Sequence, residues 1–298
     1  EVDKQKLEVD MYAINERVNQ LFFGILLLKE QLKQNQLMQE ELQRNYDNVT
    51  AYVKNGIANQ ADLDAVKVEQ LNTKQKRVDL VSSRAAYLKM LSLLVGEALS
   101  PETVLEKPVP QSTVSAVSEI RRPELALFDA QGAGLQVQEK ALNVRHLPQF
   151  GLFVQGAYGN PGLDMLKNEF SLYYMAGVRL SWNFGSLYTL KNDRRVIEKK
   201  RQQLDNNRDI FLFNTRLEMT QQDQAIHSLE KQMRDDDEII RLRTNIRKAA
   251  EAKVANGTLT VTEMLRELTN ESLARQSKAM HEIQRLMGIY QLKYTTND

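Results

Sequence analysis

Residues 7–32, LEVDMYAINERVNQLFFGILLLKEQL, carry apolar side chains at the spacing that decides the fold of the first arm of the chain. They recur in alternating steps of four and three, at Leu7, Met11, Ile14, Val18, Leu21, Ile25, Leu28 and Leu32. The register passes through polar Asn35 and Gln39 and resumes at Leu42, Tyr46, Val49 and Val53. A heptad pattern of this length is typical of helices that pack along their length. It predicts one helix from the start of the chain to about Asn55. Its richest part, Leu21–Leu28, is too short to span a bilayer and is predicted to be a wide buried face.

The composition excludes several classes of protein. The 298 residues contain 40 Lys and Arg against 39 Asp and Glu, which gives a formal net charge of +1. A nearly neutral chain is a poor candidate for a nucleic-acid-binding protein, so no nucleic-acid partner is expected. The chain has no cysteine and only three histidines. Thiolate chemistry is therefore excluded, and neither a cofactor nor a metal site is predicted.

Proline and glycine divide the chain into two arms and a centre. All six prolines lie between Pro101 and Pro161, and seven of the thirteen glycines lie between Gly132 and Gly177. Proline breaks helices and glycine weakens them, so the two proline-free arms are predicted to be helical.

Each arm is predicted to fold back on itself at an Asn-Gly pair. Asn55-Gly56 ends the first helix, because both residue types tolerate the positive φ of a tight helix end. A second periodic run follows at Leu63, Val66, Leu71, Val78, Val81, Ala85, Leu88 and Leu91. In the second arm, a stretch from about Leu187 to Ala255 is interrupted by Asn256-Gly257. A return helix is predicted from about Thr262 to Tyr290.

The two arms match at an offset of 201 residues, which places Asn55-Gly56 on Asn256-Gly257. The same offset pairs Ile25 with Ile226, Leu28 with Leu229, Gln31 with Gln232, Val53 with Val254, Asp62 with Glu263 and Leu63 with Met264. The arms are therefore interpreted as duplicated hairpins. A single hairpin cannot bury a broad face alone, so the repeats are expected to associate laterally.

The centre of the chain has the alternation of β-strands in residues 149–158 and 169–184. In the second segment one face is wholly apolar, with Leu172, Tyr174, Ala176, Val178, Leu180, Trp182 and Phe184. The opposite face carries Arg179, Ser181 and Asn183. This pattern fits a strand pair of a transmembrane barrel, and on the strands alone it fits a soluble hairpin packed on helices equally well. A lone hairpin exposes its edges and must gain strands, most simply from symmetry copies.

The predicted fold class is mainly α, with long coiled-coil-like helical hairpins, duplicated around a central transmembrane-type β-hairpin. In chain order we expect a first helical hairpin over residues 1–99, a linker over 100–121, a helix over 122–147, the β-hairpin over 148–185 and a second helical hairpin over 186–298.

Taken together, these features resemble the TolC-like outer-membrane factor family of bacterial efflux and secretion systems. Residues 122–125, RPEL, open a helix that ends in Leu147-Pro148, similar to the RP-[DE]-L helix of that family. Residues 178–185, VRLSWNFG, resemble its strand running into the second long helix. The tips VKNGI and VANGT, residues 53–57 and 254–258, resemble its helical tips. The chain is expected to lack the family's first strand pair, so that three copies would supply six strands.

The resemblance implies a homotrimer in the Gram-negative outer membrane, with most of its mass in the periplasm. Its helices would form a tunnel and its strands a channel through outer-membrane lipid. It would passively export small molecules or proteins in a tripartite efflux or type I secretion system. The tips, Asn55, Gly56, Asn256 and Gly257, would dock a periplasmic adaptor and an inner-membrane pump.

The resemblance also implies a pore constriction near the second tip, made by acidic residues three apart on the return helix. The matching positions are Glu263 and Arg266, of which only the first is acidic. Asp62 is the equivalent of Glu263 in the first repeat, and Glu267 could supply the missing acid one turn further on. A ring of charge in a narrow aqueous pore sets ion selectivity and closure. The alternative is a solvated helix face with local ion pairs.

Catalysis has no basis in the sequence, which lacks nucleotide-binding, zinc-protease and serine-hydrolase motifs, so the protein is not expected to be an enzyme. His146, His227 and His281 are predicted to be surface or packing residues. The run Asp235-Asp236-Asp237-Glu238 is predicted to be solvated, because consecutive residues point around a helix. Two other functions stay open: a periplasmic adaptor, which would have one hairpin rather than two, and a soluble coiled-coil scaffold.

Overall fold

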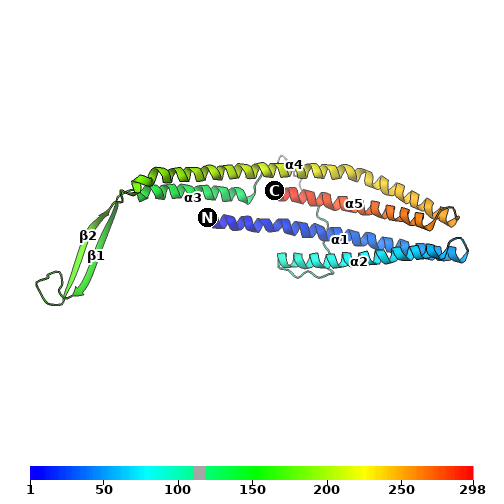
Figure 1. Ribbon diagram of the computed structural model, residues 1–298, viewed down its shortest axis with the longest axis horizontal. Helices are drawn as coiled ribbons and strands as arrows, with labels where there is room; N and C mark the ends of the chain where they lie inside the picture. Colours follow the sequence, from blue (N-terminus) through cyan, green and yellow to red (C-terminus); the bar gives the residue numbers. More distant parts are fainter. Residues whose placement is uncertain (110–117, 298) are drawn as a thin grey trace. The chain divides into compact units, whose positions relative to one another are not determined.

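The described part of the chain folds into five helices and one two-stranded sheet (Figure 1). The computed structural model describes residues 1–109 and 118–297, so residues 110–117 of the predicted linker lie outside the described residues. In chain order the elements are α1 (Val2–Lys54), α2 (Gln60–Val95), α3 (Pro123–Arg145), β1 (Gln149–Gly159), β2 (Ser171–Ser181), α4 (Ser186–Ala255) and α5 (Val261–Thr296). The predicted mainly α fold with a central β-hairpin is confirmed. None of the described helices combines the length and the apolar character needed to cross a membrane.

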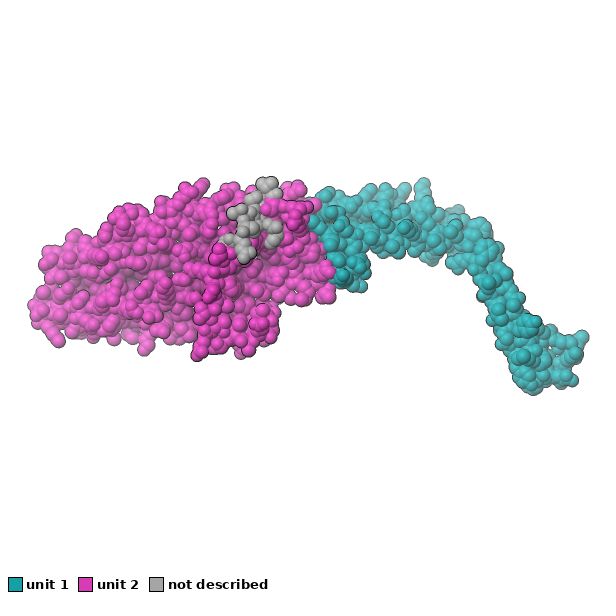
Figure 2. Space-filling model, turned by 180° about the vertical axis from the view of Figure 1, so that it is seen from behind, with its two compact units in different colours: residues 1–6, 124–211 teal, residues 7–123, 212–298 magenta. Residues whose placement is uncertain are grey.

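The structure contains two compact units (Figure 2). Unit 1 comprises residues 1–6 and 124–211 and holds the β-hairpin. Unit 2 comprises residues 7–123 and 212–298 and holds both helical tips.

In unit 2, α1 uses two neighbouring faces to pack against two helices. Ile25 packs with Leu88 of α2, whereas Phe23 and Leu26 pack with Ile283 of α5. The three α1 residues are each 1% exposed. Burial of such a side chain stabilises a fold by about 1.5–3 kcal/mol. The predicted wide buried face is therefore present, and it is wide because two helices share it.

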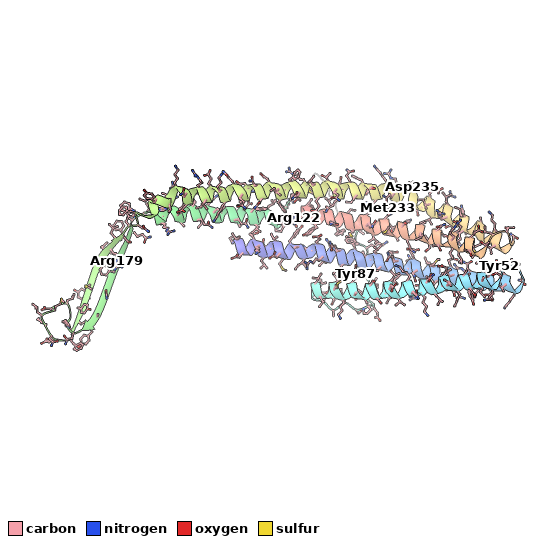
Figure 3. The ribbon with its side chains drawn as sticks, in the orientation of Figure 1. Tyr52, Tyr87, Arg122, Arg179, Met233 and Asp235 are labelled. Carbon is pink, nitrogen blue, oxygen red and sulfur yellow. The ribbon has the colours of Figure 1, made fainter. Side chains whose placement is uncertain are left out.

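Two positions on α1 fix how it lies against α2. A Cβ atom added to Gly24 would lie 2.6 Å from Cε2 of Tyr87, so the ring of Tyr87 (Figure 3) occupies the space that a side chain at this position would need. Asn35 occupies a seam position, is buried, and donates a hydrogen bond from Nδ2 to the carbonyl oxygen of Thr73 over 3.0 Å. A buried amide in a helical seam specifies the register of the two helices.

The ends of the four helices of unit 2 that meet at the tips share one core. Leu42 and Val49 of α1 and Val66 of α2 pack with Val254 of α4 and Leu268 of α5. All five side chains are buried. The two hairpins are therefore joined at their tips by apolar packing.

The chain before α3 is clamped to α1 and α5. Tyr12 and Tyr294 stack with ring centroids 4.7 Å apart, and the guanidinium carbon of Arg122 lies 5.7 and 5.4 Å from the two centroids. Figure 3 marks Arg122 at this place. The backbone N–H of Arg121 donates to the carbonyl oxygen of Thr296 over 2.8 Å. The start of the RPEL segment therefore anchors the polypeptide between two helices.

In unit 1, ion pairs join α3 to the first part of α4. Arg201 lies 3.0 Å from Glu139, and Arg208 lies 3.0 Å from Asp129. These pairs are partly exposed, and such pairs contribute little stability.

The β-hairpin is regular along its whole length. Strands β1 and β2 pair antiparallel from Gln149 opposite Ser181 to Gly159 opposite Ser171. One face carries Phe150, Leu152, Val154, Tyr158, Leu172, Tyr174, Ala176, Val178 and Leu180. The other carries Gln149, Phe153, Gln155, Tyr173, Met175, Arg179 and Ser181. The alternation predicted from the sequence is confirmed.

Several residues of the predicted seams are exposed. Leu7 and Met11 of α1 are 61% and 59% exposed. The same holds for two rows of apolar residues, Leu71, Val78 and Val81 on α2 and Ile239, Leu242 and Ile246 on α4. Within one chain, these stretches of the heptad pattern have no covering helix.

Candidate functional site

The two tips have the same backbone geometry, residue for residue. Gly56 and Gly257 adopt positive φ values of 71° and 67°. Asn55 N–H donates to the carbonyl of Ala51, and Asn256 N–H donates to that of Ala252. This bond and those donated by the next two backbone N–H groups recur after 201 residues, which is the offset found in the sequence. All four predicted tip residues are exposed.

Each tip is followed by a helix with a capping box. The Asn59 side chain accepts from the N–H of Asp62, whose carboxylate accepts from the N–H of Asn59; Thr260 and Glu263 repeat the arrangement at α5. Such reciprocal bonds satisfy backbone groups that a helix start leaves unpaired. Hydrogen bonds from the hydroxyl and the N–H of Thr260 lower the pKa of Glu263. Asp62 and Glu263, two of the three acids predicted at the constriction, therefore also hold the first turns of their helices.

Neither capping box was predicted from the sequence. Their signal is present as N-x-x-D at residues 59–62 and T-x-x-E at residues 260–263. Both patterns come directly before an apolar helical run, which is the signature of a helix start.

Arg266 and Glu267 lie together but in different surroundings. The Arg266 side chain is 73% exposed, and its Nε lies 3.6 Å from Oε1 of Glu267. The Glu267 side chain is 17% exposed and also lies 3.4 Å from Nη1 of Arg243 on α4. Glu267 therefore links α5 to α4. The role of Asp62, Glu263, Arg266 and Glu267 at a pore stays a prediction.

Glu271, one turn beyond Glu267, is the most deeply buried charged residue of the tip region and was not identified from the sequence. It is 4% exposed. Its carboxylate accepts hydrogen bonds from Thr244 over 2.7 Å, from Arg275 over 2.6 Å, and from Arg247. Burial raises its pKa, but these bonds outweigh burial and hold the pKa below the ordinary value.

Arg247 completes this group and is itself only 11% exposed. It pairs with Glu271 and Glu251, and its Nη1 lies 4.0 Å from Oε2 of Glu41 on α1. Burial lowers the pKa of Arg247, but the hydrogen bonds and charges of Glu271 and Glu251 raise it by more. The pKa of Arg247 therefore lies above its ordinary value. A cavity of about 220 Å³ borders this group between α1, α4 and α5. The group joins three helices next to the tip core.

The acidic run on α4 corrects one prediction. Asp236 is 5% exposed rather than solvated, and its carboxylate lies 2.9 Å from Nδ1 of His281 on α5. Asp237 lies 2.5 Å from Nζ of Lys278 on α5. The prediction is wrong for Asp236, which faces α5, whereas Asp235, Asp237 and Glu238 are exposed as predicted. Within the described residues, no three acidic or histidine side chains form a metal-binding group.

All three histidines are surface or packing residues, as predicted, and His281 is the one that packs against Asp236. His146 is buried at the end of α3, where its carbonyl oxygen accepts a hydrogen bond from Nε1 of Trp182 over 3.2 Å. His227 lies on the surface of α4, 3.4 Å from Glu230.

The predicted membrane face begins inside β2 and continues past its end. Leu172, Tyr174, Val178 and Leu180 lie on the apolar face of the strand. Trp182 and Phe184 follow the strand, with their ring centroids 4.4 Å apart. All six are exposed, so a continuous apolar surface leads from the hairpin to its junction with the helices.

Solved outer-membrane proteins share this fold. The chain superposes on the outer-membrane protein VceC from Vibrio cholerae with a TM-score of 0.81 at 11% identity, covering 99% of this chain and 72% of VceC. It superposes on CusC with a TM-score of 0.80 at 16% identity, covering 99% of this chain and 70% of CusC. It superposes on the open state of the MtrE outer-membrane channel from Neisseria gonorrhoeae with a TM-score of 0.76 at 12% identity, covering 99% of this chain and 68% of MtrE. No protein-family model and no curated protein sequence matches the chain. The chain thus has the fold of outer-membrane channels, and the resemblance to TolC-like outer-membrane factors is confirmed at the level of the fold.

Proposed function

We propose that the protein is a non-enzymatic subunit of an outer-membrane channel that passively exports small molecules or proteins from a Gram-negative cell, in an efflux or type I secretion system. The β-hairpin lies in the outer membrane and the long helices lie in the periplasm. The likeness to outer-membrane channels over 99% of the chain supports this proposal.

The observation that carries the proposal is the apolar face of the β-hairpin. Its large side chains are exposed from 59% at Leu180 to 85% at Leu152. A contiguous apolar surface of this kind marks an interaction site, and strands with one apolar and one polar face are what a membrane channel requires. A soluble scaffold provides nothing to cover this surface.

Conductance tests the proposal directly. We expect the purified chain, added in detergent to a planar lipid bilayer, to produce discrete current steps. Current-free bilayers, together with full release of the protein from membranes by alkaline carbonate, would favour the soluble scaffold.

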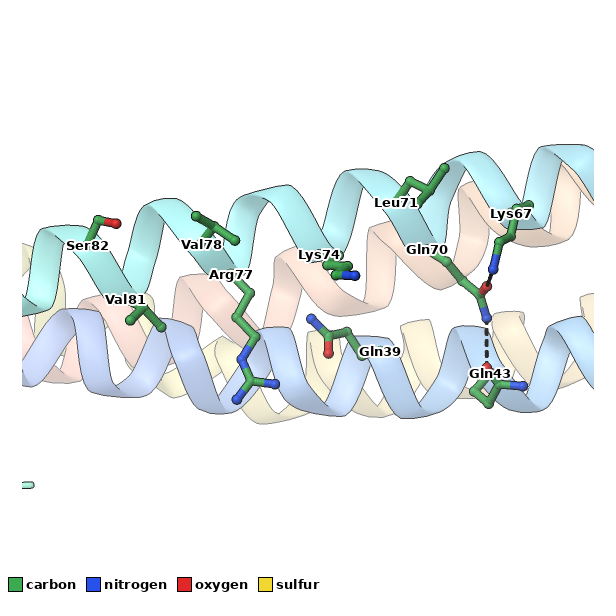
Figure 4. Close-up of a pocket in the computed structure, with 10 residues that line it drawn as sticks. All are labelled: Gln39, Gln43, Lys67, Gln70, Leu71, Lys74, Arg77, Val78, Val81 and Ser82. Atoms are coloured by element: carbon green, nitrogen blue, oxygen red, sulfur yellow. Dashed lines mark hydrogen bonds between the residues drawn. The ribbon is translucent and has the colours of Figure 1, made fainter.

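We propose a homotrimer whose subunits meet along the exposed rows of α2 and α4. On α2 the row lies in a groove of about 600 Å³, lined by Leu71, Val78 and Val81 and edged by the basic residues Lys67, Lys74 and Arg77 (Figure 4). On α4 the row of Ile239, Leu242 and Ile246 is accompanied by exposed Asp235 and Glu238. Apolar residues would face apolar ones, and Arg77, seventeen residues after the start of α2, would lie at the depth of Glu238, seventeen residues before the end of α4.

The positions of the two rows along their helices also match. Leu71 lies eleven residues after the start of α2, and Ile246 lies nine residues before the end of α4. Val78 and Ile239 lie eighteen and sixteen residues from the same ends. At 1.5 Å per residue, these depths agree to within about 3 Å. Because the two rows are different surfaces, α2 of one copy would contact α4 of the next. Repeated contacts of this kind can close into a ring.

We expect Val78→Asp to abolish the oligomer. It would place an unpaired carboxylate in the apolar row, opposite acidic residues of the next copy. Val68→Asp is the matched control, because Val68 is an exposed valine of α2 outside the groove lining. Mass in detergent, by light scattering, should fall to that of one chain for Val78→Asp alone. An unchanged mass would place the subunit contact elsewhere.

We propose that Asn55, Gly56, Asn256 and Gly257 dock a periplasmic adaptor, which links the channel to an inner-membrane pump. Their exposure and matched backbones support this assignment, since one partner surface fits both tips. The division into two helical hairpins, a linker, a central helix and a β-hairpin is proposed as the organisation of this subunit.

We propose that acids near the second tip set the ion selectivity of the pore. We expect Glu263→Gln with Glu267→Gln to lower the permeability for K⁺ relative to Cl⁻ severalfold, because a ring of negative charge favours cations. Glutamine retains the capping box, so the helix start is preserved. Glu119→Gln, which removes an exposed charge paired with Arg121 and outside the proposed subunit contact, is the control. Reversal potentials that do not change in the double variant would reject the assignment.

A further inference from the structure

Arg179 is the only charged residue in the two strands, and it lies on the polar face (Figure 3). The partner directly opposite, Gly151, has no side chain, and the preceding residue on the same face, Gly177, has none either. On the Gly151 side, therefore, no neighbouring side chain on the strands covers the guanidinium. No described residue pairs with its charge or accepts a hydrogen bond from it.

Phe153 holds the arginine in place. The guanidinium carbon lies 5.6 Å from the centroid of the Phe153 ring, diagonally across the strand pair. The ring itself lies over Gly177, where an added Cβ would come within 3.0 Å of its edge. Cation–π contact fixes one face of the guanidinium plane while its N–H donors point to the side.

The side on which Arg179 lies decides what it meets. The opposite face of the hairpin is wholly apolar, and the proposed function assigns that face to lipid. A charged side chain is expensive in lipid, so the polar face borders water. Arginine is charged at every physiological pH, and its planar fork matches carboxylate and phosphate groups.

We propose that Arg179 is a selectivity-determining residue that gives the membrane segment of the channel a preference for anions. One guanidinium from each subunit presents a fixed positive charge to passing solutes, and its free donors bind carboxylate or phosphate groups. Walls of low dielectric constant strengthen this field. The proposal rests on the proposed channel function and adds the solute class, organic and inorganic anions, and the residue that selects them.

Reversal potentials in a KCl gradient test the proposal on the full chain. We expect Arg179→Gln to lower the permeability for Cl⁻ relative to K⁺ by about tenfold, the lower end of the enrichment expected for a focused field. Arg179→Glu should lower this ratio further, whereas Arg179→Lys should keep the wild-type ratio because the charge remains. Lys167→Gln, in the link between the strands, should leave the ratio unchanged.

The outcomes separate this inference from the proposed function. Channels that conduct with the same ratio in Arg179→Gln, Arg179→Glu and the wild type would overturn the role of Arg179 and leave the channel function intact. Failure of the wild type to conduct would overturn both, because Arg179 would then line no pore. Phe153→Leu checks the positioning: it should reduce the anion preference while leaving the charge in place, and an unchanged preference would show that the ring has no such role.

Discussion

Replacing Glu271 by alanine should lower the free energy of unfolding by about 3–5 kcal/mol, the usual effect of removing one partner from a buried ion pair. The side chain of Arg247 is only 11% exposed, and the substitution would remove the carboxylate that is its principal partner. Thr244 would lose an acceptor as well. Urea denaturation followed by far-UV circular dichroism in detergent gives the measurement.

Two comparisons show whether charge burial is the cause. Glu119→Ala removes an exposed acid that pairs with Arg121, and its unfolding midpoint should equal that of the wild type. Glu271→Leu with Arg247→Met replaces the pair by apolar side chains and should recover most of the lost stability. A double variant as unstable as Glu271→Ala would contradict this account.

The same residue predicts a pH dependence. The pKa of Glu271 is lowered in the folded state, so the carboxylate stabilises the fold above its unfolded pKa, and this contribution is lost as pH falls through the folded pKa. Glu271→Gln lacks the contribution at neutral pH. The stability difference between wild type and Glu271→Gln should therefore shrink below about pH 4, near the ordinary pKa of glutamate.

Gly24→Leu should destabilise unit 2 by about 1–3 kcal/mol or more, the usual effect of overfilling a packed contact. Even a Cβ atom at this position would lie 2.6 Å from the Tyr87 ring, and leucine adds three further carbons. Better helix propensity than glycine offsets only about 1 kcal/mol of this effect.

A second glycine supplies the control. Gly134 lies in α3 with no atom within 4 Å of an added Cβ. Gly134→Ala should therefore raise thermal stability, whereas Gly24→Leu should lower it. In a Tyr87→Ala background, Gly24→Leu should lose most of its effect, because the two side chains compete for one space. Equal effects in both backgrounds would mean that Tyr87 is not the obstacle.

The sequence predicted those features that depend on neighbours along the chain. The Asn-Gly tips, the offset of 201 and the strand alternation are all local patterns, and each has its counterpart in the backbone. Helix ends were less accurate: the return helix runs to Thr296 rather than to about Tyr290. The site is known only in part, since the contacts around Glu263 and Glu267 are observed and their role in a pore stays a prediction.

The contacts between side chains of different helices could not be predicted, because they depend on which face each helix turns to its neighbours. Glu271 and Arg247 are 24 residues apart on different helices, so no local pattern connects them. Asp236 is buried for the same reason, because His281 lies opposite it on α5. A heptad pattern also identifies an apolar row on a helix but not the element that packs against that row. This explains why Val78 and Ile239 follow the pattern and are still exposed in one chain.

The buried amide of Asn35 limits how the first hairpin can deform. Asn35 and Thr73 are both buried, so sliding α1 along α2 would break the hydrogen bond from Asn35 to the Thr73 carbonyl and leave its donor and acceptor unpaired away from water. Bending, or swivelling of the whole hairpin, leaves that bond intact. If the tips move apart, we therefore expect each helical hairpin to tilt as a rigid body, without α1 sliding along α2.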